Sequence, residues 1–377
     1  MNDKIPFNIP YTTGKEMDNL AEALRLRQLS GDGDFTHNCR AWLEKKTGCI
    51  EALLTHSCTA ALELGALLMD IQPGDEVIMP SFTFVSTANA FVLRGGVPVF
   101  VDIREDTLNI DEKLIEDAIT PRTRGIAPVH YAGVSCEMDA ILDIARRHSL
   151  RVLEDAAQGL MASYKGRALG TLGDFGAVSF HATKNIISGE GGALLLNKRE
   201  DVLRGEILRE KGTNRSSFFR GEVDKYTWQD VGSSYLPAEI VAAFLAAQLE
   251  EAESITRARM EIWQAYHERL APLEARGVLR RPVIPAECAH NAHIYHVLLA
   301  PGIERQKVMD SLKERGIYTV FHYVPLHNAP AGLRYCRVHG SMRHTEELSE
   351  RLLRLPLWCG MTIAQVDYIA ETLGKLL

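Results

Sequence analysis

Reactive and hydrogen-bonding side chains occur where expected strands end or an expected helix begins. Asp155 follows an expected strand at 151–154, within the run Glu-Asp-Ala-Ala-Gln. Lys184 lies in the run Ser-Phe-His-Ala-Thr-Lys-Asn, where an expected strand at 175–180 ends. Ser57 and Thr59 lie at the start of an expected helix at 59–69. Because parallel α/β sheets bind ligands beyond the carboxyl ends of their strands, we expect these side chains to share one site.

This set of residues suits a cofactor that is a phosphate ester and also carries an aldehyde and a protonatable ring nitrogen. A helix N-terminus binds anions, so Ser57, Thr59 and the amides of Thr59 and Ala60 could hold the phosphate. A lysine with a lowered pKa, here Lys184, can attack the aldehyde. A carboxylate such as Asp155 keeps a pyridine nitrogen protonated, which makes the ring an electron sink.

Each of these residues also has an ordinary structural explanation. Asp155 could end a turn or cap a helix, Lys184 could be a solvated surface charge, and Ser57 with Thr59 could form a helix N-cap. The functional interpretation gains weight because all of them fall on one expected edge of one sheet.

The elements that must position these residues alternate between residues 50 and 200. The expected strands lie at 76–79, 98–102, 125–130, 151–154, 175–180 and 193–196. The expected helices lie at 59–69, 85–93, 111–119 and 138–148. In the last of them, Met138, Ile141, Leu142 and Ala145 recur with the period of one helix face. This alternation predicts an α/β fold with a mostly parallel sheet and helices on both faces.

The pattern changes after about residue 237. The stretch 239–270 is rich in alanine and charge and contains no Gly or Pro, which predicts one long helix or two abutting helices. An extended run at 292–299, a helix at 304–315 and an extended run at 317–321 follow. Thr362 and Gln365 form a capping-box pattern before a final helix. These elements predict a smaller α+β domain.

Composition excludes several classes of protein. The chain has 377 residues, of which 46% are hydrophobic and 24% charged, and a formal net charge of −7. A chain of this size usually contains more than one hydrophobic core. The acidic balance argues against a nucleic-acid binder, and no apolar run approaches the roughly 20 residues of a membrane span. The N-terminal residues contain no apolar stretch typical of a secretion signal, and the seven scattered cysteines form no CxxC pair. We therefore expect a cytoplasmic protein with reduced thiols.

Several motifs resemble those of the DegT/DnrJ/EryC1/StrS family of sugar aminotransferases. The motifs are EDAAQ, SFHATKN followed by GEGGALL, and PSFTFVSTANAF. The resemblance covers nearly the whole chain, including IPFNIP near the start and FHYVPLH and LRLPL near the end. It implies the fold of type I pyridoxal 5'-phosphate transferases, which is aspartate aminotransferase-like. It also implies a large cofactor-binding domain at 20–240 and a small C-terminal domain at 241–377, on which segment 1–19 packs.

The resemblance implies a role for individual residues around the cofactor. Lys184 would be the catalytic lysine that attaches the cofactor through its aldehyde. Asp155 would pair with the pyridinium nitrogen, Gln158 would bind the 3-hydroxyl oxygen, and Phe84 would stack on the ring. The phosphate would be held by Thr59, Ala60 and Ser179. His181 matches a common residue of the family but receives no chemical step.

One segment departs from the family pattern. Many members place an asparagine of the partner subunit on the cofactor phosphate, in a run resembling GYNYRL. Here the corresponding residues 232–237 read GSSYLP and contain no asparagine. Ser233, Ser234 or Tyr235 could take its place.

The resemblance implies an aminotransferase that moves nitrogen from L-glutamate to a dTDP-linked 4-ketosugar, in a homodimer or dimer of dimers with shared active sites. The candidate substrate residues are Lys211, Arg215, Arg220, His322 and Tyr323. A C3-ketosugar or a GDP- or UDP-linked acceptor remains an alternative. So do a nicotinamide-dependent oxidoreductase, although no GxGxxG follows the first strand, and a non-catalytic sugar-binding regulator. We expect no metal site, because His290, His293 and His296 do not fall on one face of a strand.

Overall fold

A computed structural model of the chain describes residues 4–377. Its centre is a sheet of eight strands in the order β1-β9-β8-β5-β4-β2-β3-β13. In that order, their bounds are Glu51–Thr55, Gly192–Leu196, Phe175–Ser179, Arg151–Asp155, Thr123–Ile126, Glu76–Pro80, Val97–Val101 and Arg337–Val338. The strands from β8 to β13 pair in parallel, whereas β9 runs antiparallel to both of its neighbours. The expected α/β fold with a mostly parallel sheet is confirmed.

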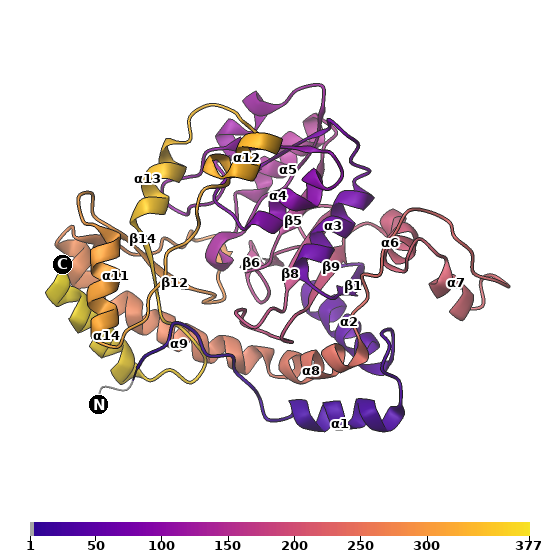
Figure 1. The fold of residues 1–377 in the computed structure, drawn as a ribbon, viewed down its shortest axis with the longest axis horizontal. Coiled ribbons are helices and arrows are strands. Elements are labelled where there is room, and N and C mark those ends of the chain that lie inside the picture. The colour runs from indigo at the N-terminus through magenta and orange to yellow at the C-terminus, as the bar shows by residue number, and fades with distance from the viewer. Residues whose placement is uncertain (1–3) are drawn as a thin grey trace.

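Helices cover the sheet on both sides (Figure 1). Up to residue 219 the helices are α1 (Glu16–Leu26), α2 (Asp34–Thr47), α3 (Cys58–Leu68), α4 (Val85–Val92), α5 (Met138–Arg147), α6 (Val202–Arg209) and α7 (Arg215–Phe219), of which α1 and α7 lie away from the sheet. Alternate residues of each strand face opposite sides, so Leu53 and Val77 lie in one core and their neighbours Leu54 and Ile78 in the other.

The C-terminal part of the chain forms a third core. Its sheet has the order β10-β12-β14, with bounds Leu279–Arg280, Tyr295–Leu299 and Leu352–Leu355. Its helices are α9 (Ala252–Arg269), α10 (Ala271–Ala275), α11 (Arg305–Glu314) and α14 (Ile363–Leu376). Two further helices, α12 (Pro330–Tyr335) and α13 (Arg343–Arg351), lie outside this core, and Leu348 of α13 packs with Phe82 and Tyr131. The capping box of Thr362 and Gln365 at the start of α14 is confirmed. Ile5 joins this core, because its backbone bonds to Gly316 and Tyr318 at 2.8 and 3.0 Å.

Two abutting helices connect the cores, as one of the two sequence alternatives predicted. Ala242 and Leu245 of α8 (Glu239–Glu250) pack in a core of the large sheet, whereas Ile262 and Trp263 of α9 pack in the third core. The division of the chain into two domains near residue 240 remains a proposal, with α8 and α9 as the connection.

A few expected elements differ from those found. The helix expected at 111–119 is replaced by two single turns of 3₁₀ helix, Glu112–Leu114 and Glu116–Ala118, the first of which is capped by Asp111. The extended run at 317–321 makes only isolated bridges at Ile317 and Val320. A small sheet with the order β11-β6-β7 (Cys288–Ala289, Ser163–Tyr164, Arg167–Ala168) was not expected. No helix within residues 4–377 is long and apolar enough to cross a membrane.

Candidate active site

A cavity of about 440 Å³ lies beyond the carboxyl ends of β5 and β8. Its wall combines the N-terminus of α3 and the ends of these strands with residues of the C-terminal part of the chain. Most of the residues predicted to bind a cofactor line it: Thr59, Phe84, Asp155, Gln158, Ser179 and Lys184, as do His322 and Tyr323. The edge of the sheet expected from the sequence is therefore where these side chains come together.

Hydroxyl groups gather at one end of the cavity, around the start of α3. Ser57 caps this helix, since its Oγ accepts a 3.1 Å hydrogen bond from the Ala60 amide. Thr59 Oγ1 lies 2.8 Å from Ser86 Oγ, and Ser179 ends β8 on the same wall. Hydroxyls beside a helix N-terminus fit a phosphate group. The Ala60 amide is already bonded to Ser57 and Ala60 does not line the cavity, so its predicted phosphate contact gains no support here.

A close backbone approach keeps this end of the cavity compact. A Cβ atom on Gly192, at the start of β9, would lie 2.5 Å from the Cys58 nitrogen and 2.6 Å from the Ser57 carbonyl carbon. Only glycine fits at that position. Gly192 therefore allows the start of β9 to pack directly against the start of α3.

Asp155 is held by a side chain from a different element. Thr87 of α4 donates a 2.6 Å hydrogen bond to Oδ2, and the Ala157 amide donates to Oδ1 at 3.1 Å. The hydroxyls of Thr83 and Thr87 lie 2.8 Å apart. Since the Thr87 hydroxyl donates its one proton to Asp155, Thr83 is the donor in this second hydrogen bond. Asp155 is 5% exposed. A buried carboxylate with a fixed direction is suited to facing a protonated ring nitrogen.

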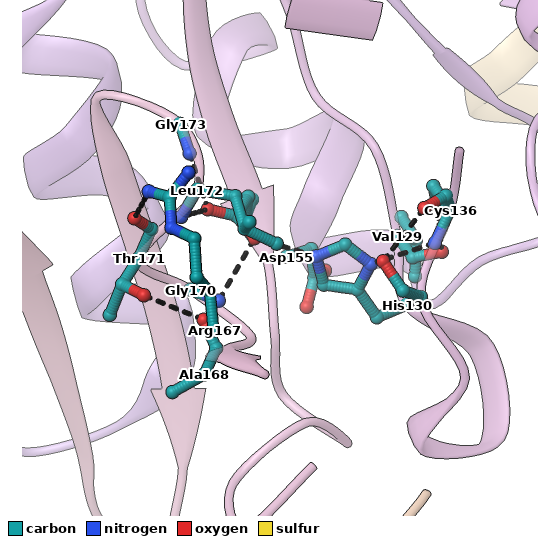
Figure 2. A network of polar contacts seen from close by, with 12 residues as sticks. Val129, His130, Cys136, Asp155, Arg167, Ala168, Gly170, Thr171, Leu172 and Gly173 are labelled. Carbon is teal, nitrogen blue, oxygen red and sulfur yellow. Dashed lines mark hydrogen bonds and ion pairs between the residues drawn. The ribbon is translucent and has the colours of Figure 1, made fainter. Parts of the chain in front are cut away.

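The preceding residue, Glu154, anchors the end of β5 from the other face of the sheet. Its carboxylate accepts hydrogen bonds from the amides of Gly170, Leu172 and Gly173 at 2.9, 2.7 and 2.6 Å. His130 contacts it at 2.8 Å, in the network drawn in Figure 2. The Cys136 amide donates to Nδ1 of His130, so the proton of a neutral ring is on Nε2 and points at Glu154. Neither side chain is accessible, and this network holds the strand end that carries Asp155.

Lys184 projects into the same cavity from the turn after β8. Its backbone amide bonds to the His181 carbonyl at 2.8 Å. Burial lowers the pKa of the Lys184 ammonium, and the nearby Arg354 lowers it further, whereas Cys58 and Asp155 act in the opposite direction. No carboxylate within residues 4–377 forms an ion pair with Nζ. A lysine in these surroundings is activated as a nucleophile and as a base.

Gln158 joins the two walls of the cavity. Its Oε1 accepts a 2.7 Å hydrogen bond from the Ala132 amide, which fixes the orientation of the side-chain amide. Nε2 then donates to the Tyr323 hydroxyl at 2.9 Å. His322 contacts the hydroxyl of Tyr131 at 3.1 Å, and burial, followed by the charges of Arg354 and Lys184, holds the pKa of His322 well below its usual range.

The basic candidates for substrate binding do not lie in this cavity. Lys211 and Arg215 form ion pairs with Glu210, and Arg220 pairs with Glu206 and Glu222. Figure 1 shows α7, which Arg215 begins, at a distance from the body of the sheet. Their role in substrate binding stays a prediction.

The segment that replaces the family asparagine does not line the cavity of this chain either. Tyr235 is buried and stacks on His56, with ring centroids 6.3 Å apart, and Ser234 makes a backbone bridge to Glu210. A contact of this segment with a cofactor therefore remains a prediction about an assembled dimer.

Sequence reasoning missed several residues that line the cavity or lie directly behind its wall. Thr87 lies inside the quoted run PSFTFVSTANAF, but nothing in the run shows that its hydroxyl reaches Asp155. Arg354 and Phe7 lie in the quoted runs LRLPL and IPFNIP, and only the fold brings both to the cavity wall. Arg259 of α9 also lines the cavity and donates to the carbonyls of Ala292 and His293. Residues 4–377 contain no cluster of side chains suited to a metal ion.

Comparison with known proteins adds to this geometry. Residues 10–374 match the model of the DegT/DnrJ/EryC1/StrS aminotransferase family. The spore coat polysaccharide biosynthesis protein SpsC of Bacillus subtilis is 33% identical over 387 aligned positions, which cover 100% of this chain and 97% of SpsC. The crystal structure of the aminotransferase TlmJ from Streptoalloteichus hindustanus superposes with a TM-score of 0.90 at 28% identity, covering 99% of this chain and 100% of TlmJ. Spr1654 from Streptococcus pneumoniae, in its PLP-form, gives a TM-score of 0.90 at 26% identity, with 99% and 100% coverage.

Proposed function

Starting from the fact that this chain belongs to the DegT/DnrJ/EryC1/StrS aminotransferase family, we propose that it transfers the amino group of L-glutamate to the C4 ketone of dTDP-4-dehydro-6-deoxy-D-glucose. The products would be dTDP-4-amino-4,6-dideoxy-D-galactose and 2-oxoglutarate. The chain is a pyridoxal 5'-phosphate-dependent sugar aminotransferase. The donor, the nucleotide and the ring carbon belong to the proposal.

Long segments of the sequence support the finer assignment. GDGDFTHNCRAWLE, PVHYAGVSCEMD and EKGTNRSSFFRGEVDKYTWQDVGSSYL resemble dTDP-4-amino-4,6-dideoxygalactose transaminase, which makes the aminosugar of enterobacterial common antigen. The name of SpsC, a spore coat polysaccharide biosynthesis protein, agrees with a role in making a cell-surface polysaccharide. We also propose a cytoplasmic homodimer in which each cavity is completed by the partner subunit.

The observation that carries the aminotransferase assignment is one cavity that contains both Lys184 with a lowered pKa and the oriented carboxylate of Asp155. Pyridoxal phosphate, when bound, supplies an electron sink that stabilises negative charge on the carbon next to the transferred nitrogen. Its phosphate fits the hydroxyls of Thr59 and Ser179, and its ring nitrogen fits Asp155. Gln158 would bind the 3-hydroxyl oxygen, and Phe84, which is 57% exposed, has a free ring for stacking.

Lys184 is the group that we expect to move protons. Its Nζ takes the proton from the α-carbon of the donor and, in the second half-reaction, delivers a proton to C4 of the sugar. Burial lowers the pKa of the Lys184 ammonium, which favours the neutral amine that can accept a proton. His322 and Tyr323 would contact the sugar, and Lys211, Arg215 and Arg220 would meet the diphosphate from a neighbouring subunit.

A panel experiment tests this proposal. Purified protein is incubated with pyridoxal phosphate, L-glutamate and a set of dTDP-, UDP- and GDP-linked 4-ketosugars and 3-ketosugars, and products are identified by mass spectrometry. We expect amination of the dTDP-linked 4-ketosugar, and no turnover by Lys184→Ala. Lys165→Ala, which removes an exposed lysine paired with Asp139, is the control and should keep wild-type activity. Amination of a 3-ketosugar alone would refute the acceptor, and full activity of Lys184→Ala would refute the catalytic lysine.

A further inference from the structure

His293 has a ring nitrogen without a hydrogen-bond partner on the wall of the cavity that contains Lys184. It lies in the turn before β12, and its side chain lines the cavity although the residue is only 6% exposed. Its Nδ1 lies 3.0 Å from Oδ1 of Asn185. Among residues 4–377, its Nε2 has no hydrogen-bond partner, yet this atom is not sealed in the interior.

The contacts of Asn185 determine which nitrogen of His293 carries the proton. Nδ2 of Asn185 donates a 2.8 Å hydrogen bond to the Asn291 carbonyl, so its Oδ1 is the atom that faces His293. An amide oxygen only accepts, so Nδ1 of His293 is the donor in the 3.0 Å contact. Burial, followed by the charges of Lys184 and Arg259, holds the pKa of His293 well below its usual range. In the neutral ring, Nε2 therefore has no proton and is a hydrogen-bond acceptor.

Backbone contacts fix the turn that carries His293. The His293 amide donates a 3.0 Å hydrogen bond to Oδ1 of Asn291, and the His293 carbonyl accepts one from Arg259 at 2.7 Å. Nδ2 of Asn291 in turn donates to the carbonyls of Gln158 and Leu160 at 2.8 and 2.7 Å. The direction of the Nε2 lone pair is thus set before any ligand binds.

Lys184 is the donor that these surroundings offer to Nε2. Asn185, which holds the ring, follows Lys184 in the chain, so one turn carries both the lysine and the residue that orients the ring. Of the charged groups that act on His293, Lys184 has the largest effect, followed by Arg259 and Arg354. Arg259 uses its donors on the carbonyls of residues 292 and 293. Among residues 4–377, Nζ of Lys184 has no hydrogen-bond partner of its own.

We propose that Nε2 of His293 accepts a hydrogen bond from Nζ of Lys184 whenever Nζ is not bonded to the cofactor, an inference that rests on the aminotransferase function proposed above. In that state Nζ must take a proton from one carbon and deliver it to another, and a free lysine side chain has many rotamers. An acceptor in a fixed position restricts these rotamers and orients Nζ for the transfer. Because the ring is kept neutral, it does not take the proton itself. His293 is therefore a positioning residue.

Two substitutions separate the roles of the two ring nitrogens. The amide nitrogen of an asparagine lies near the position of Nδ1, so His293→Asn keeps the donor to Asn185 and loses the acceptor at Nε2. A glutamine side chain reaches the position of Nε2, so His293→Gln keeps an acceptor there and loses the donor to Asn185. A purely structural role makes His293→Gln the more damaging variant, whereas the proposal makes it His293→Asn. His37→Asn, at an exposed position of α2, is the control.

The first measurement is the pKa of Lys184 in the protein loaded with pyridoxamine phosphate, in which Nζ is not bonded to the cofactor. It is obtained from the pH dependence of acetylation of Lys184, read by mass spectrometry. An acceptor stabilises the ammonium more than the amine, so we expect this pKa to fall by about 1 in His293→Asn. It should stay within about 0.3 of the wild-type value in His293→Gln and His37→Asn. An unchanged pKa in His293→Asn, or a larger change in His293→Gln, would overturn the proposal.

The second measurement is the half-reaction with L-glutamate in a single turnover. We expect His293→Asn to slow it about 10-fold and to raise the isotope effect of α-deuterated glutamate, with the half-saturating glutamate concentration changed by less than about twofold. His293→Gln should react within about threefold of the wild-type rate. A slower reaction in His293→Gln than in His293→Asn would overturn the proposal. The acetylation measurement needs no substrate, so failure of the wild type to aminate any ketosugar would refute the proposed function and leave the result on His293 as measured.

Discussion

Thr87 donates a 2.6 Å hydrogen bond to Oδ2 of Asp155, so that a side chain of α4 aims the carboxylate at the end of β5. The same carboxylate accepts from the Ala157 amide through its other oxygen. Its direction is therefore set by two neighbours before any ligand arrives. A charged group that is already oriented can stabilise the transition state without the free-energy cost of reorienting during the reaction.

The first prediction concerns this pair. Asp155→Asn keeps an acceptor for Thr87 but removes the negative charge and the acceptor for the Ala157 amide, so we expect turnover to fall about 100- to 1,000-fold together with some loss of stability. Thr87→Val keeps the charge and loses one orienting hydrogen bond, so we expect a fall of roughly fivefold. Steady-state rates and thermal unfolding of the cofactor-loaded variants measure both effects. A Thr87→Val variant as damaged as Asp155→Asn would show that orientation, not charge, dominates.

The second prediction concerns the network behind Asp155. Glu154→Gln replaces one carboxylate oxygen by an NH2 donor. The carboxylate accepts hydrogen bonds from three backbone amides and contacts His130. We expect the free energy of unfolding to fall by about 3 kcal/mol, because buried donors lose their acceptor. Glu253→Gln, at an exposed ion pair with Lys46, should change it by less than about 0.5 kcal/mol. Urea titrations with coinciding midpoints for the two variants would contradict this account.

The third prediction concerns acid stability. Burial alone would raise the pKa of Glu76, but hydrogen bonds from Arg337, Thr120 and Arg122 outweigh it and lower the pKa to about 2. A folded-state pKa below the unfolded one contributes stability above about pH 4.5, and that stability is lost as the pH falls toward 2, here on the order of 3 kcal/mol. Glu76→Gln should therefore be less stable than wild type at pH 7 and show a flatter decline in acid. If the free energy of unfolding of wild type and of Glu76→Gln changed with pH in the same way, the lowered pKa of Glu76 would be refuted.

The fourth prediction compares two arginines, one without an anionic partner among the described residues and one paired with a buried glutamate. Arg354 has no anionic partner among the described residues, so Arg354→Met should leave the melting temperature of the ligand-free protein unchanged or raise it. Arg337 makes hydrogen bonds to both oxygens of the buried Glu76 at 3.0 and 2.8 Å, so Arg337→Met should lower the melting temperature by several degrees. Differential scanning calorimetry of both variants measures this. A clear loss of stability in Arg354→Met would mean that its role is structural.

The core of the candidate site could be predicted from the sequence because strand ends are local features. Asp155 and Lys184 each follow a short buried strand, and Ser57 precedes an apolar helix, so their common edge follows from a parallel sheet alone. The order of helices and strands between residues 59 and 196 was predicted from the same alternation. Apart from the helix expected at 111–119 and the unexpected strands β6 and β7, these elements match the structure, because buried periodicity determines this part of the fold.

The remainder depends on contacts between distant parts of the chain. β1 was missed because Glu51, Ala52 and Leu53 are good helix formers, and its extended conformation follows from pairing with β9. Arg354 and Phe7 come from opposite ends of the sequence, and their contact arises only through the third core. Residues of this kind cannot be placed by periodicity, since nothing near them in sequence indicates what they face.

The most direct measurement of the central claim follows the nitrogen itself. Cofactor-loaded wild-type protein is given L-glutamate with an isotopically labelled amino nitrogen and dTDP-4-dehydro-6-deoxy-D-glucose, and the purified sugar product is analysed by NMR. The account predicts labelled nitrogen on C4 with the configuration of galactose, and no labelled product from Lys184→Ala. Labelled nitrogen on another ring carbon, or labelled product from Lys184→Ala at the wild-type rate, would contradict it.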